Sequence, residues 1–92
     1  MSLYKIILVD DEEEVRDSIK RKVDWNLLGF EVIGSVNNGE EAMELTETNH
    51  VDVVLTDIKM PFMDGLTLCA KVKENYKNTK VVLYSGFDEF EF

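Results

Sequence analysis

The chain has 92 residues, enough for one small domain, and its 45% hydrophobic content argues against disorder. Nineteen acidic residues against ten basic ones give a net charge of −9, which disfavours binding to nucleic-acid phosphates or to an anionic membrane. The single cysteine, Cys69, excludes an intrachain disulfide and a cysteine-rich zinc site, and no apolar run is long enough to span a bilayer, so we expect a cytoplasmic globular domain.

Four short apolar segments predict β-strands. Residues 6–9 are too few for a helix and rich in β-branched side chains, as expected of a strand buried on both faces of a parallel sheet. Residues 51–55 and 81–84 have the same character. Residues 30–36 alternate more loosely, which predicts an edge strand.

Three stretches between these strands have helical spacing. Their stripes are Val15, Ile19 and Val23, then Ala42, Leu45, Thr46 and Asn49, then Leu68, Cys69, Val72 and Tyr76. Asp11 and Glu14, in the acidic run before the first stripe, have the spacing of a capping box. Because strands and helices alternate, we predict βαβ units in a doubly wound, three-layer α/β fold with a parallel sheet.

Polar groups follow three of the four predicted strands. Asp10 and Asp11 follow the first strand, Asp57 the third, and Ser85 with Gly86 the fourth. In open parallel sheets, ligand sites lie beyond the carboxyl ends of the strands, so the three carboxylates are expected to meet if the first and third strands are neighbours. Two carboxylates about 4 Å apart repel by roughly 4 kcal/mol at an effective dielectric of about 20.

Raised pKa values or a bound cation would relieve this repulsion. Carboxylate oxygens suit Mg²⁺, which commonly bridges to phosphate, so the pattern indicates phosphoryl chemistry.

Simpler interpretations exist for each of the three groups of residues. The acidic run complements a helix dipole, Asp57 can begin an Asx turn, and Ser85-Gly86 suits an ordinary turn. The coincidence of suitable groups at three strand ends favours a site.

Three segments together resemble the receiver domain of bacterial two-component response regulators. They are residues 7–12 (ILVDDE), 57–65 (DIKMPFMDG) and 83–86 (LYSG). The resemblance implies a flavodoxin-like sheet with strand order 2-1-3-4 in this chain. Residues 25–36 and 87–90 look most similar to regulators that carry an arabinose-regulator-type helix-turn-helix output domain, which would bind DNA from beyond this chain.

The resemblance also implies a role for each site residue. Asp57 would accept a phosphoryl group from a histidine kinase. Asp11, Asp57 and the main-chain carbonyl of Lys59 would bind Mg²⁺, and Asp10 would act mainly through a coordinated water. Ser85 would hydrogen-bond the phosphoryl group and move inward, which couples the site to a distant surface. The domain would be a signalling phosphoacceptor and not an enzyme.

One family feature is absent from these 92 residues. The family has a lysine after a fifth strand that pairs with the phosphoryl group, and Lys80 cannot replace it because it begins the fourth strand. We therefore expect residues 1–92 to be a C-terminally incomplete receiver without its catalytic lysine, fifth strand and last helix. Without the last helix, part of the first helix would be uncovered. We therefore expect the isolated fragment to form a homodimer, swap elements or be poorly stable.

Other conspicuous residues have structural interpretations. His50 is expected in a loop, and Cys69 is expected to be a small core residue. Trp25, Leu27 and Leu28 are expected to close the first helix against the core. Phe62 is expected to be exposed beside the site, where it could meet a kinase, and Met63 to pack under the third helix.

Two other functions stay open at this point. One is a vestigial receiver that serves as a phosphorylation-independent interaction module. The other is a haloacid-dehalogenase-like phosphatase, which needs a second acid two residues after its nucleophile, where this chain has Lys59.

Overall fold

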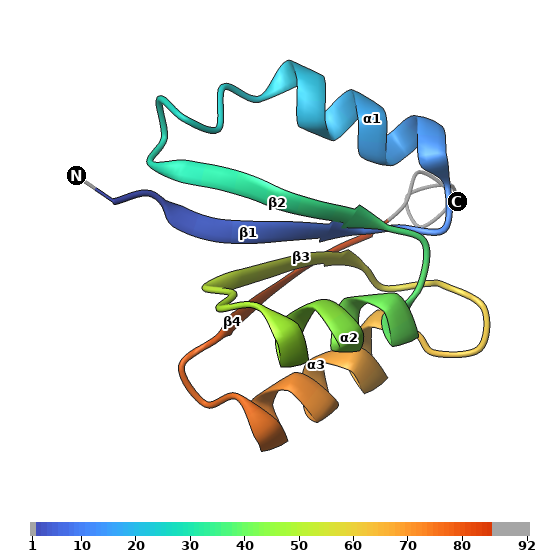
Figure 1. The fold of residues 1–92 in the computed structure, drawn as a ribbon. Coiled ribbons are helices and arrows are strands. Elements are labelled where there is room, and N and C mark those ends of the chain that lie inside the picture. Colours follow the sequence, from blue (N-terminus) through green and yellow to red (C-terminus); the bar gives the residue numbers. More distant parts are fainter. Residues whose placement is uncertain (1, 86–92) are drawn as a thin grey trace.

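The computed structural model describes residues 2–85, which form one sheet with helices on both faces (Figure 1). The strands are β1 (Tyr4–Val9), β2 (Phe30–Val36), β3 (Val53–Asp57) and β4 (Lys80–Tyr84). All paired strands are parallel and their order is β2-β1-β3-β4, which confirms the predicted doubly wound topology. Among the described residues, β2 is an edge strand, as its loose alternation predicts.

The third strand begins at Val53 and not at residue 51. Val51 is only 4% exposed and belongs to the core, but it precedes the paired segment. The apolar pattern identifies buried residues, and it does not separate a buried residue in a connection from one in a strand. β3 extends instead through Thr56 to Asp57, and both of these side chains are buried.

Helix α1 (Glu13–Lys22) lies on one face of the sheet, and α2 (Gly39–Thr48) and α3 (Gly65–Asn75) lie side by side on the other (Figure 1). The side chains of Asn38 and Asp64 accept hydrogen bonds from the main-chain N–H groups of Glu41 and Thr67, so α2 and α3 have conventional N-caps.

The predicted capping box of α1 is wrong. Its N-cap residue is Glu12, whose side chain makes no capping hydrogen bond. The carboxylate of Asp10 instead accepts the N–H of Glu12. The acidic first turn, with Glu13 and Glu14, still complements the helix dipole.

The main core lies between the sheet and helices α2 and α3. Its buried members are Ile7, Val9, Ala42, Val51, Val54, Met60, Leu68 and Val72. Met63 is half-buried and packs against this core. Cys69 is half-buried and is not one of the buried core residues, in contrast to its predicted role. Asn49, the last member of the more polar stripe predicted for α2, is instead the exposed C-cap of the helix. None of the described helices is both long and apolar enough to cross a membrane.

The face toward α1 is well covered at β1 but not at β4, where Val82 is 49% exposed. Ile6 and Leu8 alternate with the core residues of β1 and are 3% and 2% exposed. On α1, Val15 and Ile19 are only half-buried, and the buried residue is Arg16. Val23 lies past the end of the helix as its C-cap.

Leu27 and Leu28 do not close α1 against the core, and that prediction is wrong. They are 81% and 62% exposed, because the segment between α1 and β2 turns outward before Gly29, whose φ is 94°. Only Trp25 packs inward, with its ring edge-on to Phe30 and the ring centroids 6.1 Å apart.

Candidate functional site

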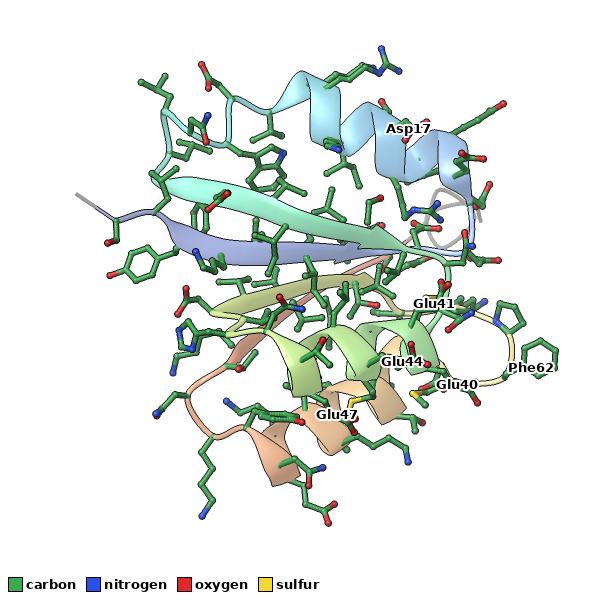
Figure 2. All side chains as sticks on the ribbon, in the orientation of Figure 1. Asp17, Glu40, Glu41, Glu44, Glu47 and Phe62 are labelled. Atoms are coloured by element: carbon green, nitrogen blue, oxygen red, sulfur yellow. The ribbon has the colours of Figure 1, made fainter. Side chains whose placement is uncertain are left out.

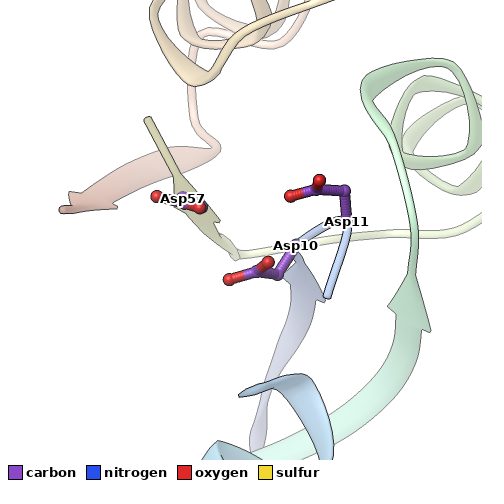
Figure 3. Close-up of side chains that lie close together, drawn as sticks. All are labelled: Asp10, Asp11 and Asp57. Carbon is purple, nitrogen blue, oxygen red and sulfur yellow. The ribbon is translucent and has the colours of Figure 1, made fainter. Parts of the chain in front are cut away.

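Three carboxylates meet at the carboxyl edge of the sheet (Figure 3). One oxygen from each of Asp10, Asp11 and Asp57 can be chosen so that all lie within 4.8 Å of one another. Asp10 and Asp11 follow β1, and Asp57 ends β3. Because Val9 pairs with Thr56 in the parallel ladder, the next residue of each strand emerges at the same place.

The three carboxylates differ in exposure and in hydrogen bonding. Asp10 is 1% exposed and Asp57 is 5% exposed, whereas Asp11 is exposed to solvent. Both oxygens of Asp10 accept hydrogen bonds, Oδ1 from the N–H of Glu12 at 2.8 Å and Oδ2 from the hydroxyl of Tyr84 at 2.5 Å. Asp57 Oδ1 is buried and has no hydrogen-bond partner among the described residues.

The environment of Asp57 opposes its negative charge. Burial raises the pKa of its carboxyl above the ordinary value, and the charges of Asp10 and, to a smaller extent, Asp11 raise it further. The main-chain N–H groups of Ile58 and Lys59 act in the opposite direction. A buried acceptor without a donor, next to like charges, is the arrangement that a bound cation would relieve.

The donor set fits a hard divalent cation. It consists of carboxylate oxygens, one side open to solvent at Asp11, and contains no nitrogen or sulfur ligand. Mg²⁺ prefers oxygen donors and keeps several waters, so a partly exposed group of three carboxylates suits it. Lys59 lies two residues after Asp57 on the same loop, with its side chain exposed.

Ser85 lies close to this edge, directly after β4. Tyr84 is the register partner of Asp57, so Ser85 is one residue beyond that pair. Ser85 is half-buried. The structure thus brings the three carboxylates together and places the predicted hydroxyl at the end of the adjoining strand.

The loop from β3 to α3 is held close beneath Asp57. The N–H of Gly65 donates to the carbonyl of Ile58 at 2.7 Å, and a Cβ at Gly65 would lie 2.2 Å from the carbonyl oxygen of Asp57. Phe62 at the outer turn of this loop has a φ of 69° and is fully exposed, as predicted (Figure 2).

Two residues around the carboxylates escaped the sequence analysis. Arg16 is 7% exposed, and its Nη1 donates to the main-chain oxygen of Asp10 and, at 2.7 Å, to Asn37 Oδ1, while its Nε donates to Ser35 Oγ at 3.0 Å. Tyr84 is the donor to Asp10. An arginine beside the apolar stripe of α1 and a tyrosine at a strand end were the available signals, but neither has a specific meaning in sequence.

His50 lies far from this site. It precedes β3 at the opposite end of the sheet, where Nε2 lies 2.8 Å from Asp52 Oδ1. Its ring is largely exposed, which agrees with the predicted loop position. A catalytic or relay role with Asp57 inside this chain is therefore excluded by distance along the strand.

A family model described as the response regulator receiver domain matches residues 6–92. The chain belongs to the response regulator receiver family. This receiver domain is 41% identical over 98% of its length to the uncharacterized transcriptional regulatory protein YesN of Bacillus subtilis, of which it covers 24%. It is 29% identical over 98% of its length to the transcriptional regulatory protein HptR of Staphylococcus aureus, covering 35% of that protein.

Solved receiver structures have the same fold. The REC domain of AraT, a response regulator from Geobacillus stearothermophilus, matches with a TM-score of 0.87 and 40% identity, over 96% of this chain and 68% of that one. The two-component transcriptional regulator AraC from Clostridium phytofermentans matches with a TM-score of 0.85 and 31% identity, over 94% of this chain and 67% of that one. These two structural neighbours confirm the resemblance to arabinose-regulator-type response regulators.

Proposed function

We propose that this receiver domain takes a phosphoryl group from a histidine kinase onto Asp57 in a Mg²⁺-dependent reaction. The observation that supports this most strongly is the buried, unpartnered Oδ1 of Asp57 among carboxylates at the carboxyl edge of the sheet. A group that is buried without a partner demands an explanation, and an in-line nucleophile beside a cation site supplies one.

Asp11, Asp57 and the main-chain carbonyl of Lys59 would hold the ion, and Asp10 would hold one of its waters. When bound, Mg²⁺ would offset the negative charge of the phosphoryl oxygens. Asp57 would attack phosphorus in line and form the acyl phosphate P–O bond, while the P–N bond breaks and its electron pair returns to the imidazole of the kinase. Ser85 would then donate a hydrogen bond to a phosphoryl oxygen.

We also propose that the domain controls transcription through a DNA-binding output domain in the same cytoplasmic protein. The chain spans only about a quarter to a third of its curated relatives YesN and HptR, which are described as transcriptional regulators. The net charge of −9 disfavours direct binding of DNA by residues 1–92. The chain also covers only 68% of the solved AraT receiver.

Phosphorylation of the complete reading frame by acetyl phosphate and Mg²⁺ tests the proposal. Intact-mass measurement is expected to show one added phosphoryl group in the wild type and none in Asp57→Asn. Asp52→Asn is the matched control, because Asp52 directly precedes β3 whereas Asp57 ends it, so the two carboxylates lie at opposite ends of the same strand. No mass change in the wild type contradicts the proposal.

A metal titration separates this function from a phosphorylation-independent interaction module. Millimolar Mg²⁺ is expected to raise the melting temperature, because an ion that binds only the folded state stabilises it by mass action. A melting temperature that does not respond to Mg²⁺ would favour the vestigial receiver.

A further inference from the structure

We propose that Tyr84 is a positioning residue for the acidic site, where its hydroxyl fixes the Asp10 carboxylate for a metal-bound water. The inference rests on the proposed Mg²⁺-dependent function. It adds a role for a residue that no sequence motif identifies.

The first observation is that Asp10 is fixed from several directions. Tyr84 donates to Oδ2 at 2.5 Å, and the N–H of Glu12 donates to Oδ1 at 2.8 Å. Arg16 donates to the main-chain oxygen of the same residue. The Asp10 side chain is 1% exposed, and the two groups that donate to its carboxylate come from the end of β4 and from the N-cap residue of α1.

The second observation is the acceptor capacity that remains. Each carboxylate oxygen has about two lone-pair sites, and each oxygen of Asp10 uses one of them. Asp10 can therefore accept a further hydrogen bond from a water on a cation, while Asp57 Oδ1 stays available as a direct ligand or nucleophile. Loss of the phenol hydroxyl would free Asp10 to rotate, and the water site would lose its fixed acceptor.

The third observation is that Tyr84 connects three strand ends. Its side chain bonds Asp10 after β1, its carbonyl accepts the N–H of Ile58 after β3 at 3.0 Å, and it is the register partner of Asp57. It also directly precedes Ser85. A shift of the end of β4 would therefore move the donor to Asp10. In this way Tyr84 links the proposed metal site to Ser85, the residue proposed as the switch.

A tyrosine hydroxyl on a buried acid can also serve stability alone. The two roles differ in what they change. A structural role alters the melting temperature of the metal-free protein, whereas a positioning role also alters Mg²⁺ affinity, and does so only while the Asp10 carboxylate is present.

The test is a double-mutant cycle on Mg²⁺ affinity, measured by calorimetry with MgCl₂ in the complete reading frame. Tyr84→Phe keeps the ring and removes the hydroxyl, and is expected to weaken Mg²⁺ binding about tenfold. In an Asp10→Asn background the same change is expected to have no further effect. Tyr76→Phe is the matched control, since Tyr76 is a half-buried tyrosine on the α2 and α3 side of the sheet.

Equal Mg²⁺ affinity of Tyr84→Phe and the wild type overturns the role of Tyr84 and leaves the proposed function intact. A tenfold loss that persists unchanged in the Asp10→Asn background also overturns it. If the wild type itself binds no Mg²⁺, both the positioning role and the proposed function fail. Should Tyr84→Phe not fold, Tyr84→Leu, which is smaller and carries no hydrogen-bond donor on its side chain, provides the comparison.

Discussion

At the scale of single residues, Asp57 combines two conditions that are costly for a carboxylate. It is 5% exposed, and it shares its surroundings with Asp10 and Asp11. The same conditions raise its pKa and leave Oδ1 without a donor among the described residues. Sites that act on charged substrates commonly hold such groups at the expense of fold stability.

Asp57→Asn is therefore expected to stabilise the metal-free protein by about 1–3 kcal/mol, because it removes one member of a repelling group. Urea unfolding in buffer with a chelator measures the difference. With Mg²⁺ present the gain is expected to shrink, because an ion at the proposed site would stabilise the wild type and the variant would lack one of the ligands. A neutral or destabilising effect in the metal-free protein would mean that the carboxylates do not repel in the folded state.

Asp52, at the opposite end of the sheet, has its pKa shifted in the other direction. Its Oδ2 accepts the N–H of Lys5 at 2.7 Å, and this bond, with smaller contributions from His50, lowers its pKa from 3.8. A lowered pKa in the folded state means that the unfolded state binds more protons, so this contribution to stability is present above pH 3.8 and disappears as the pH falls through the lowered value.

Asp52→Asn is accordingly expected to cost about 0.5–1 kcal/mol at neutral pH, since the amide oxygen can still accept the Lys5 N–H. The cost is expected to vanish in acid below the lowered pKa. Unfolding curves at several pH values check this, with the exposed Asp17→Asn of α1 as a control that should show a smaller change (Figure 2). A cost that grows in acid would contradict the sign.

At the scale of elements, the β3 to α3 loop sets the position of Asp57. Gly65 begins α3 directly beneath the Asp57 carbonyl, where a Cβ would lie 2.2 Å from that oxygen and 2.9 Å from Ile58 Cα. Both neighbours are main-chain atoms, so they cannot rotate away as a side-chain tip would. The absence of a side chain here allows the helix start to approach the strand end.

Gly65→Ala is expected to destabilise the domain by about 1–3 kcal/mol, as overpacking does, and to reduce phosphorylation of Asp57 by acetyl phosphate. Gly29→Ala is the matched control. No heavy atom lies within 4 Å of a Cβ placed at Gly29, but its φ of 94° strains any other residue. The control is expected to lose stability without losing phosphorylation in the fraction that is folded. Equal phosphorylation of the two variants would show that Gly65 does not contribute to the position of Asp57.

Sequence patterns predicted the elements well where side chains alternate or repeat. The four strands and three helices agree with the structure, because apolar periodicity and the βαβ rule are strong constraints. The strand order also agrees, but it was implied by the family resemblance and not by periodicity. The exposed Leu27 and Leu28 were misjudged, since hydrophobicity alone does not say whether a loop turns inward. Arg16 and Tyr84 were missed because a buried polar contact depends on packing between segments distant in sequence.

At the scale of the whole molecule, the charge of −9 is concentrated in part on α2. Glu40, Glu41, Glu44 and Glu47 all lie on this helix, which has no basic residue in its last turn (Figure 2). Like charges three or four residues apart on a helix repel one another. Together with the carboxylates of the candidate site, they make the fold sensitive to screening by dissolved ions.

Monovalent salt is therefore expected to raise the melting temperature, since screening acts within a Debye length of about 10 Å at 0.1 M. MgCl₂ at the same ionic strength is expected to raise it further, because a bound ion neutralises Asp11 and Asp57 beyond what screening supplies. Asp11→Asn is expected to remove only this additional increment. Asp11 is exposed, so its substitution leaves the core undisturbed. An identical response of Asp11→Asn and the wild type to MgCl₂ at matched ionic strength would show that Mg²⁺ acts on the surface charge as a whole, and not at the three carboxylates.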